Sequence, residues 1–307
     1  VEPPCPRRHE GCGGCDWQHV AISAQMDAKV QIVIDALART AKLANPAVTA
    51  GGSVPEWAYR TTIRVVGDAE GRASYRAERS NEPVSASGCI VAHPALAALL
   101  DDLRITPGLE VTLRVSVASG EMTAHWDRAA GEVSGLPEQV ATGRDAAVFE
   151  LVGGHQFKVS AASSFQSGPA AAELLVDAVK RAAPELGRAR RVLDAYAGVG
   201  LFALAATSPS SHVVTVEYSK SSVGDSRVNL AGRNATIVPR EVMHWKPLEK
   251  QRFDVVIADP ARTGLGKPGV RALVAAKART FVLVSCDPAS LARDTALLAA
   301  AGYRHDG

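Results

Sequence analysis

Cys286 is the side chain of this sequence best suited to covalent chemistry. It follows an apolar run at 281–285 and precedes Asp287-Pro288, a pattern typical of the first turn of a helix. A helix N-terminus favours the thiolate form of a cysteine, and the thiolate is the nucleophile. The sequence therefore indicates a nucleophile that adds to an electrophilic ring such as a pyrimidine, although a thiol packed in the core fits the same pattern.

Residues 190–206 predict a binding site for a nucleoside. An apolar run ends at Asp194, and the turn Gly198-Val199-Gly200 leads into a Leu- and Ala-rich segment without a helix breaker. A strand, a glycine turn and a helix N-terminus bring backbone N–H groups close to a nucleotide-like ligand. Glu217 ends the next apolar run, about 20 residues beyond the glycines, where it can accept hydrogen bonds from a ribose diol.

A parallel sheet must position these residues. Short apolar runs alternate with helical segments from residue 190 onward, and four of the runs lead into Asp194, Glu217, Asp259 and Cys286. Alternating strands and helices predict a doubly wound, Rossmann-like α/β domain with a mostly parallel sheet. Ligands of such folds bind outside the carboxyl ends of the strands, so we expect the four side chains along one edge.

Three further cysteines near the N-terminus predict a metal centre. Cys5, Cys12 and Cys15 are separated by six and two residues, with glycines among them that let backbone N–H groups turn toward thiolate or sulfide. The candidates for a fourth ligand are Cys89, His9 and His19. Zinc and an iron–sulfur cluster fit this spacing equally well.

The residues between these cysteines and the parallel sheet predict a β-rich domain. Apolar residues at helical spacing predict a helix over 20–44, and alternation of polar and apolar residues over 57–165 predicts antiparallel strands. This region gathers Arg60, Arg64, Arg72, Arg76, Arg79, Tyr59 and Tyr75. Guanidinium groups beside aromatic rings can contact RNA phosphates and unpaired bases, while a solvated strand face has the same composition. We therefore divide the chain into 1–165 and 166–307.

Composition favours neither a membrane protein nor a secreted one. Of the 307 residues 47% are hydrophobic and 21% are charged. No apolar run approaches the ~20 residues of a membrane span, and no secretory signal precedes Cys5, so we expect a cytoplasmic protein without a membrane partner. The net charge of +2 is small, so any nucleic-acid surface must be local. The first residue is not Met and the last residues stop where a strand could begin, so we expect both ends to be incomplete.

Motifs along essentially the whole chain resemble those of the RNA uracil-C5 methyltransferases. This is a class I, S-adenosylmethionine-dependent family that carries an iron–sulfur cluster and includes ribosomal RNA enzymes. The matching segments are C-P-x5-C-G-G-C-D-W-Q-H from Cys5, W-x-Y-R from Trp57, C-x3-H-P from Cys89, F-Q at 165–166, D-x-Y-x-G-x-G from Asp194, V-E at 216–217, D-P-A-R-x-G from Asp259 and V-S-C-D-P from Val284. The resemblance implies a methyltransferase whose substrate is RNA.

The resemblance also implies a role for each group of residues. The family's nucleophile is the cysteine of the S-C-[ND]-P motif, here Cys286, which attacks C6 of uracil while C5 receives the methyl group. A 4Fe-4S cluster would be held by Cys5, Cys12, Cys15 and Cys89, which favours iron over zinc. The positions matching the S-adenosylmethionine and target-base pocket are Gln166, Tyr196, Gly198, Gly200, Leu201, Glu217 and Asp259, with Glu241 aligned more loosely. Arg262 would organise Asp259 or the RNA backbone.

We accordingly expect a monomer that forms 5-methyluridine in 23S ribosomal RNA. The segment 259–264 lacks the cysteine typical of RNA cytosine-C5 enzymes, and the tRNA-specific bacterial branch generally lacks the cysteine cluster. The alternatives are a tRNA uracil-C5 methyltransferase, a non-catalytic iron–sulfur RNA-binding protein and a small-molecule methyltransferase. The family's general base is a glutamate a few tens of residues beyond the nucleophile, whereas this sequence ends 21 residues after Cys286, so we expect it to trap a covalent RNA adduct without turning over.

Overall fold

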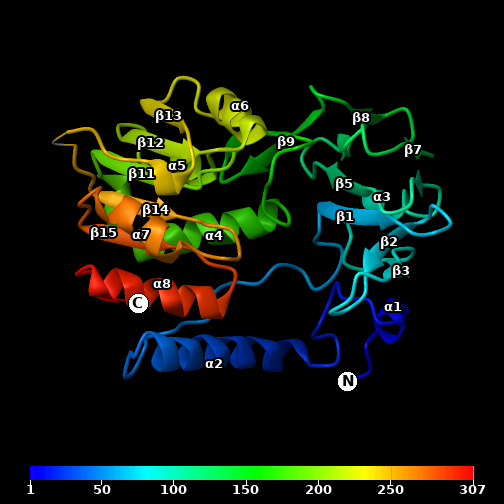
Figure 1. Ribbon diagram of the computed structural model, residues 1–307, viewed down its shortest axis with the longest axis horizontal. Helices are drawn as coiled ribbons and strands as arrows, with labels where there is room; N and C mark the ends of the chain where they lie inside the picture. The colour runs from blue at the N-terminus through cyan, green and yellow to red at the C-terminus, as the bar shows by residue number, and fades with distance from the viewer. Residues whose placement is uncertain (250, 307) are drawn as a thin grey trace. The chain divides into compact units, whose positions relative to one another are not determined.

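The computed structural model describes residues 1–249 and 251–306, which form two compact units. The first unit comprises Val1–Gln25 and Ser53–Ala172, and the second comprises Met26–Gly52 and Glu173–Gly307 (Figure 1). The segment 26–52 thus belongs with the second unit, and the division into 1–165 and 166–307 stays a prediction. Among the described residues, no helix combines the length and the apolar character needed to cross a membrane.

The first unit is built mainly from short strands, as the alternating pattern predicts. Its helices are α1 (Pro6–His9), the start of α2 (Ile22–Thr40) and α3 (Pro94–Ala97). Its strands are β1 (Thr62–Gly67), β2 (Ala73–Arg76), β3 (Pro83–Ser85), β4 (Arg104–Ile105), β5 (Glu110–Val115), β6 (Met122–His125), β7 (Val133–Ser134), β8 (Val140–Thr142), β9 (Ala147–Val152) and β10 (His155–Ser160). Six of them form one sheet in the order β3-β2-β1-β5-β6-β8, while β9 pairs with β10 and β4 with β7.

One face of the six-stranded sheet forms the core of the first unit. Ile63 on β1 lies opposite Leu113 on β5, and Val65 lies opposite Val111. All four side chains are at most 4% exposed. Because successive side chains of a strand point to opposite faces, the polar residues between them project from the other face of the sheet.

The second unit alternates strands and helices. Its helices are most of α2, most of α4 (Pro169–Ala182), α5 (Leu201–Ala205), α6 (Lys220–Asn229), α7 (Gly266–Val274) and α8 (Pro288–Ala300), with 3-10 turns η1 (Pro184–Gly187) and η2 (Val242–His244). Its strands are β11 (Arg191–Ala195), β12 (His212–Glu217), β13 (Ala235–Pro239), β14 (Val255–Ala258) and β15 (Thr280–Leu283). The helix predicted over 20–44 is α2, and the helix predicted after the glycine turn is the short α5.

The five strands of the second unit form one parallel sheet, which confirms the predicted α/β fold. Their order is β13-β12-β11-β14-β15 (Figure 1). The chain begins in the middle at β11, moves outward through β12 to β13, and continues on the other side with β14 and β15. Ligands of open α/β sheets bind outside the carboxyl ends of the strands at such a reversal, here between β11 and β14.

The strands at this reversal are apolar on both faces. Val192 and Leu193 on β11 and Val255, Val256 and Ile257 on β14 are fully buried. Parallel strands covered on both faces read as continuous apolar runs, which is why the sequence pattern located them. Polar residues begin where the strands end, so the chemistry of the second unit is confined to that edge.

Candidate active site and cysteine pocket

The carboxyl ends of the parallel strands carry the side chains that the sequence pattern selected. Glu217 is the last residue of β12, Asp194 lies one residue before the end of β11, Asp259 directly follows β14, and Cys286 follows the end of β15. The strand order puts Glu217 on one side of β11 and Asp259 and Cys286 on the other. The structure brings these four residues to one edge of the sheet, and their roles stay predictions.

Hydrogen bonds join the glycine turn to Glu217. Gly198 and Gly200 have φ values of +54° and +90°, left-handed conformations that glycine adopts without strain. The half-buried Glu217 carboxylate accepts the N–H of Gly198 at 3.0 Å and those of Tyr218 and Ser219 at 2.8 Å. An anionic acceptor is thereby held next to a glycine turn, the combination that binds a ribose in dinucleotide-binding folds.

Asp194 lies beneath this turn and is completely buried. Its Oδ2 accepts the N–H of Ala203 in α5 at 2.9 Å, whereas its Oδ1 has no hydrogen-bond partner in the described part of the chain. Burial raises the pKa of Asp194 to about 8; the Ala203 N–H opposes this shift, and the carboxylates of Asp259 and Glu217 add to it. Asp194 therefore anchors α5 while carrying a proton over much of the neutral range.

Three more residues predicted for the cofactor pocket lie in the second unit. Tyr196 has a φ of +60°, and its N–H bonds to the carbonyl of Val216 at 2.9 Å. A non-glycine residue in this conformation is strained, and such strain clusters at ligand sites. Leu201 is the buried first residue of α5, and Glu241 is exposed before η2 with its Oε2 3.2 Å from His244 Nδ1.

Gln166 lies in the first unit, between β10 and α4. Its contact with the cofactor therefore stays a prediction.

Cys286 is an exposed free thiol, which excludes the alternative of a core cysteine. The next residue, Asp287, caps α8: its Oδ1 accepts the N–H of Ser290 at 2.8 Å, and Pro288 occupies the first turn. The Ser290 N–H holds the pKa of Asp287 below its usual value, and the Arg262 guanidinium, 3.6 Å away, acts in the same direction. The cap fixes the backbone directly after the thiol, and Arg262 lies beside this loop.

Helix α8 also holds the start of α7, a feature that the sequence reasoning missed. Asp294 is 1% exposed, and its carboxylate accepts the N–H of Leu265 at 2.6 Å and that of Gly266 at 3.1 Å. The helix that begins beside Cys286 is thereby tied to the segment that follows Asp259.

Two neighbours of Asp294 extend this attachment. The Ser290 hydroxyl donates to the carbonyl of Arg262 at 3.0 Å, and the Arg293 guanidinium donates to the carbonyl of Thr263 at 2.7 Å. We refer to Ser290, Arg293 and Asp294 as the α8 clamp. Their spacing of three and four residues puts them on one face of the helix, and polar residues at that spacing are the signal that could have revealed them.

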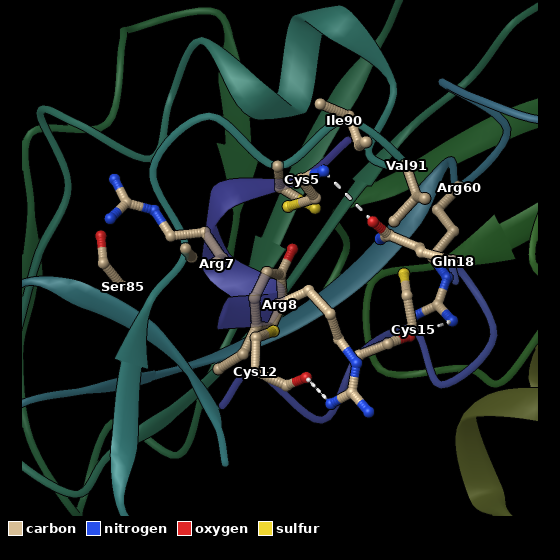
Figure 2. A pocket seen from close by; sticks show the side chains of 14 residues that line it. Cys5, Arg7, Arg8, Cys12, Cys15, Gln18, Arg60, Ser85, Ile90 and Val91 are labelled. Carbon is tan, nitrogen blue, oxygen red and sulfur yellow. Dashed lines mark hydrogen bonds between the residues drawn. The ribbon is translucent and has the colours of Figure 1, made fainter. Parts of the chain in front are cut away.

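The four cysteines predicted as ligands line one pocket of the first unit. Cys5 precedes α1, Cys12 and Cys15 lie in the loop after it, and Cys89 follows β3. Figure 2 shows side chains of this pocket, with the sulfur atoms of Cys5, Cys12 and Cys15 around a common space. Within the described residues, no three His, Cys, Asp or Glu side chains are grouped so as to hold a metal ion.

A close approach of two backbone segments builds the rim of this pocket. The N–H of Gly13 donates to the carbonyl of Arg76 at 3.1 Å, and a Cβ at Gly13 would lie 3.1 Å from the backbone of Glu78. Only glycine fits there without displacing that backbone. The glycine between Cys12 and Cys15 thus lets the cysteine loop lie against the end of β2.

The pocket also contains a cation and a phenol. Burial raises the pKa of the Cys12 and Cys15 thiols, and at Cys15 hydrogen bonding to Gln18 and the charge of Arg60 oppose that shift. Arg60 donates to the carbonyl of Gly14 at 3.3 Å. Burial also raises the pKa of Tyr75, whose hydroxyl shares a hydrogen bond with Cys89. The pocket thus brings four thiols beside a guanidinium, and a metal group held by these thiols stays a prediction.

The predicted gathering of arginines is divided in the structure. The ion pairs are Arg72 with Asp68 and Glu70, Arg76 and Arg64 with Glu110, and Arg79 with Glu78. Arg60 instead faces the cysteine pocket. The pairs of Arg64, Arg76 and Arg79 are exposed and contribute little to stability, so these arginines remain able to exchange partners, whereas Arg72 is held by the buried Asp68.

Comparisons with known proteins cover both units. A family profile described as "Methyltransferase small domain" matches residues 164–278. An "Uncharacterized RNA methyltransferase" of Streptomyces avermitilis is 32% identical, with 99% of this chain and 78% of that protein aligned. The 23S rRNA (uracil(1939)-C(5))-methyltransferase RlmD of Halomonas elongata is 30% identical, with 99% and 72% aligned. The crystal structure of Pyrococcus abyssi tRNA (uracil-54, C5)-methyltransferase in complex with S-adenosyl-L-homocysteine shares the fold, with a TM-score of 0.67, 20% identity and 92% and 79% of the two chains covered.

Proposed function

This chain belongs to the RNA (uracil-C5)-methyltransferases, and from that premise we propose that it forms 5-methyluridine in 23S ribosomal RNA. It is an enzyme with the S-adenosylmethionine-dependent methyltransferase fold. The observation that carries the proposal is the edge of the parallel sheet, where Glu217, Asp194 and Asp259 are followed by the exposed thiol of Cys286. A protein that only binds RNA needs no such combination.

The glycine turn and its neighbours fit the cofactor. Glu217 supplies the acceptor for ribose hydroxyls, and the left-handed Gly198 and Gly200 let the backbone approach a ligand closely. The buried Asp194 Oδ1, which lacks a partner among the described residues, is the kind of polar atom that a bound ligand satisfies. The other residues of the proposed cofactor site are Gln166, Tyr196, Leu201, Glu241 and Asp259. When bound, S-adenosylmethionine would supply the methyl group as a sulfonium electrophile, and its methyl–sulfur bond would break to leave a neutral thioether.

Cys286 makes the uracil ring reactive toward that electrophile. Its thiolate forms a bond to C6, and the electron pair of the C5–C6 double bond moves toward the C4 carbonyl oxygen. C5 then forms its bond to the methyl group, a base removes the C5 proton, and the returning electron pair restores the double bond and expels the thiolate. The Asp287 cap holds the backbone beside this thiol, and the α8 clamp ties the same helix to the segment after Asp259.

A 4Fe-4S cluster held by Cys5, Cys12, Cys15 and Cys89 is part of the same proposal. Its support is that all four thiols line one pocket. A zinc ion draws four ligands to about 2.3 Å from one point, whereas a cluster places its own iron and sulfide atoms between the thiolates, which suits ligands standing around a pocket. The role of the cluster is structural and in RNA docking, because its ligands lie in the first unit and the chemistry at Cys286 transfers no electron.

The choice of 23S ribosomal RNA rests on the relative of Halomonas elongata, which is named for that substrate. The cysteine set supports the ribosomal RNA branch of the family over the tRNA enzymes.

We place the protein in the cytoplasm, where it acts as a monomer on RNA. A small-molecule substrate would leave the first unit without a function.

The test is covalent capture of RNA. In 5-fluorouridine, fluorine replaces the C5 hydrogen that a base must remove as a proton before the thiolate is expelled. A 23S ribosomal RNA fragment containing 5-fluorouridine should therefore remain bound to Cys286 after methyl transfer. With the protein in its full natural length, we expect a covalent complex that carries label from S-adenosylmethionine, and the same fragment with unmodified uridine, which is released after turnover, is the control. The Cys286→Ala and Cys286→Ser proteins should form no covalent complex, yet they should still bind the RNA non-covalently.

Two results would refute the mechanism. One is a labelled adduct with Cys286→Ala, and the other is no adduct from cluster-loaded wild-type protein. Parallel reactions with tRNA distinguish the two RNA substrates, and an adduct with tRNA alone would overturn the choice of ribosomal RNA.

A further inference from the structure

We infer that the outer face of the six-stranded sheet binds an unpaired nucleotide of the substrate RNA, an inference that rests on the proposed function. A groove of about 410 Å³ opens on this face, lined in part by Arg64, Glu110, Thr112, His125, Trp126 and Asp127. A volume of this size is typical of sites for small ligands. The groove shares no lining residue with the cysteine pocket.

The polar residues of this Trp126 groove form a row across neighbouring strands. Arg64 on β1 lies opposite Thr112 on β5, and Thr112 lies opposite His125 on β6. The Arg64 side chain is 70% exposed, and His125 is exposed as well. Hydrogen-bonding groups with fixed spacing are therefore presented on a rigid sheet whose opposite face is core.

Trp126 adds a fixed aromatic ring at the end of this row, half-buried because it also packs against the core of the first unit. Its indole N–H donates to the carbonyl of Gly131 at 3.2 Å, which sets the orientation of the ring. The Arg128 guanidinium lies 4.5 Å from the ring centroid and donates to the Thr142 hydroxyl at 3.0 Å. Aromatic rings and guanidinium planes are the surfaces on which proteins stack unpaired RNA bases.

The charges around the groove favour a phosphate-bearing partner. Its two acids, Glu110 and Asp127, are outnumbered by three arginines: Arg64 in the lining, Arg76 paired with Glu110 at 2.9 Å, and Arg128 over the Trp126 ring. Arg64 stands 4.0 Å from Glu110, an exposed pair that contributes little and leaves the guanidinium able to bind a phosphate. An acidic peptide would use the cations but not the stacking plane, so the combination favours RNA.

The experiment compares RNA binding and methyl transfer by groove variants of the protein in its full natural length, with its proposed cluster. Trp126→Ala should weaken RNA binding about ten-fold, as loss of one base stack does, and should raise KM for RNA more than it lowers kcat. Trp126→Phe, which keeps a ring, should restore most of the affinity. Arg64→Ala should reduce the slope of log K against log salt by about one. The matched control is Arg39→Ala on α2, whose 81% exposed side chain lies outside the groove.

A cross-linking experiment on the unaltered protein does not depend on the folding of any variant. RNA carrying 4-thiouridine should cross-link to the peptide that contains Trp126, identified by mass spectrometry. The inference is overturned if that peptide is never cross-linked, or if folded Trp126→Ala and Arg64→Ala proteins bind RNA like the wild type. Wild-type methyl transfer together with unchanged groove variants rejects only the groove, whereas no methyl transfer by the wild type rejects the proposed function.

Discussion

Replacing Asp294 by alanine should loosen the attachment between α8 and the segment after Asp259. The carboxylate of Asp294 accepts the N–H groups of Leu265 at 2.6 Å and Gly266 at 3.1 Å. Alanine has no acceptor for either N–H group. Because α8 begins beside Cys286, this proposed nucleophile and the strand end that leads into Asp259 would lose a common support. We expect lower stability of the second unit and slower methyl transfer.

The structure sets the size of this effect. A buried backbone donor left unpaired costs about 1–3 kcal/mol, and Leu265 is buried while Gly266 is half-buried, so we expect a loss of about 3 kcal/mol. In a domain of this size each kcal/mol lowers Tm by about 2–4 °C, which corresponds to a decrease of roughly 6–12 °C. Asp294→Asn keeps one acceptor oxygen and should lose about half as much.

Thermal denaturation followed by circular dichroism measures these changes. The matched control is Asp35→Ala on α2, because the Asp35 side chain is 47% exposed and 3.7 Å from Arg39. Such surface pairs contribute less than about 1 kcal/mol, so the control should melt close to the wild type. If Asp294→Ala melts no lower than the control and retains full kcat, the clamp does not support the site and the reasoning is refuted.

Three further predictions concern single residues. Burial raises the pKa of Asp194 from its usual 3.8 to about 8, so between these pH values the folded state keeps a proton that the unfolded chain releases, and stability falls as pH rises. Asp194→Asn should flatten that fall in the calorimetric Tm measured from pH 5 to 8. An unchanged slope of Tm against pH would contradict this prediction. Glu217→Gln should weaken S-adenosylmethionine binding at least ten-fold in calorimetric titration, because charge-assisted hydrogen bonds contribute about 1.5–3 kcal/mol, and wild-type affinity would remove Glu217 from the site. Cys89→Ser should lower the iron content and visible absorbance of anaerobically purified protein, and full iron loading would exclude Cys89 as a ligand.

The edge of the parallel sheet could be predicted because its determinants are local. The strands are buried on both faces and appear as apolar runs, and the polar residues that end them, such as Glu217 and Asp259, are adjacent in sequence to those runs. The left-handed turn at Gly198 and Gly200 is equally local, since glycine adopts that conformation without strain.

Features that depend on pairing between distant segments could not be predicted. Composition grouped Arg64 and Arg76 as neighbouring cations, but the pairing of β1 with both β5 and β2 brings Glu110 next to both of them. Asp294 reads as one acid in an exposed helix, and its bonds to Leu265 and Gly266 become visible only when α7 and α8 pack together. Glu110 thus compensates two cations and Asp294 satisfies two backbone donors, and both partnerships join segments that are distant in sequence.

Mapping of the transferred methyl group tests the central claim most directly. The protein in its full natural length, with the proposed cluster intact, would be incubated with labelled S-adenosylmethionine and either unmodified 23S ribosomal RNA or tRNA. The product nucleosides would be located by mass spectrometry. We predict label as 5-methyluridine at one uridine of the ribosomal RNA. Label on another base, or no label in either RNA, would contradict the assignment of Cys286 as the nucleophile of a uracil-C5 methyltransferase.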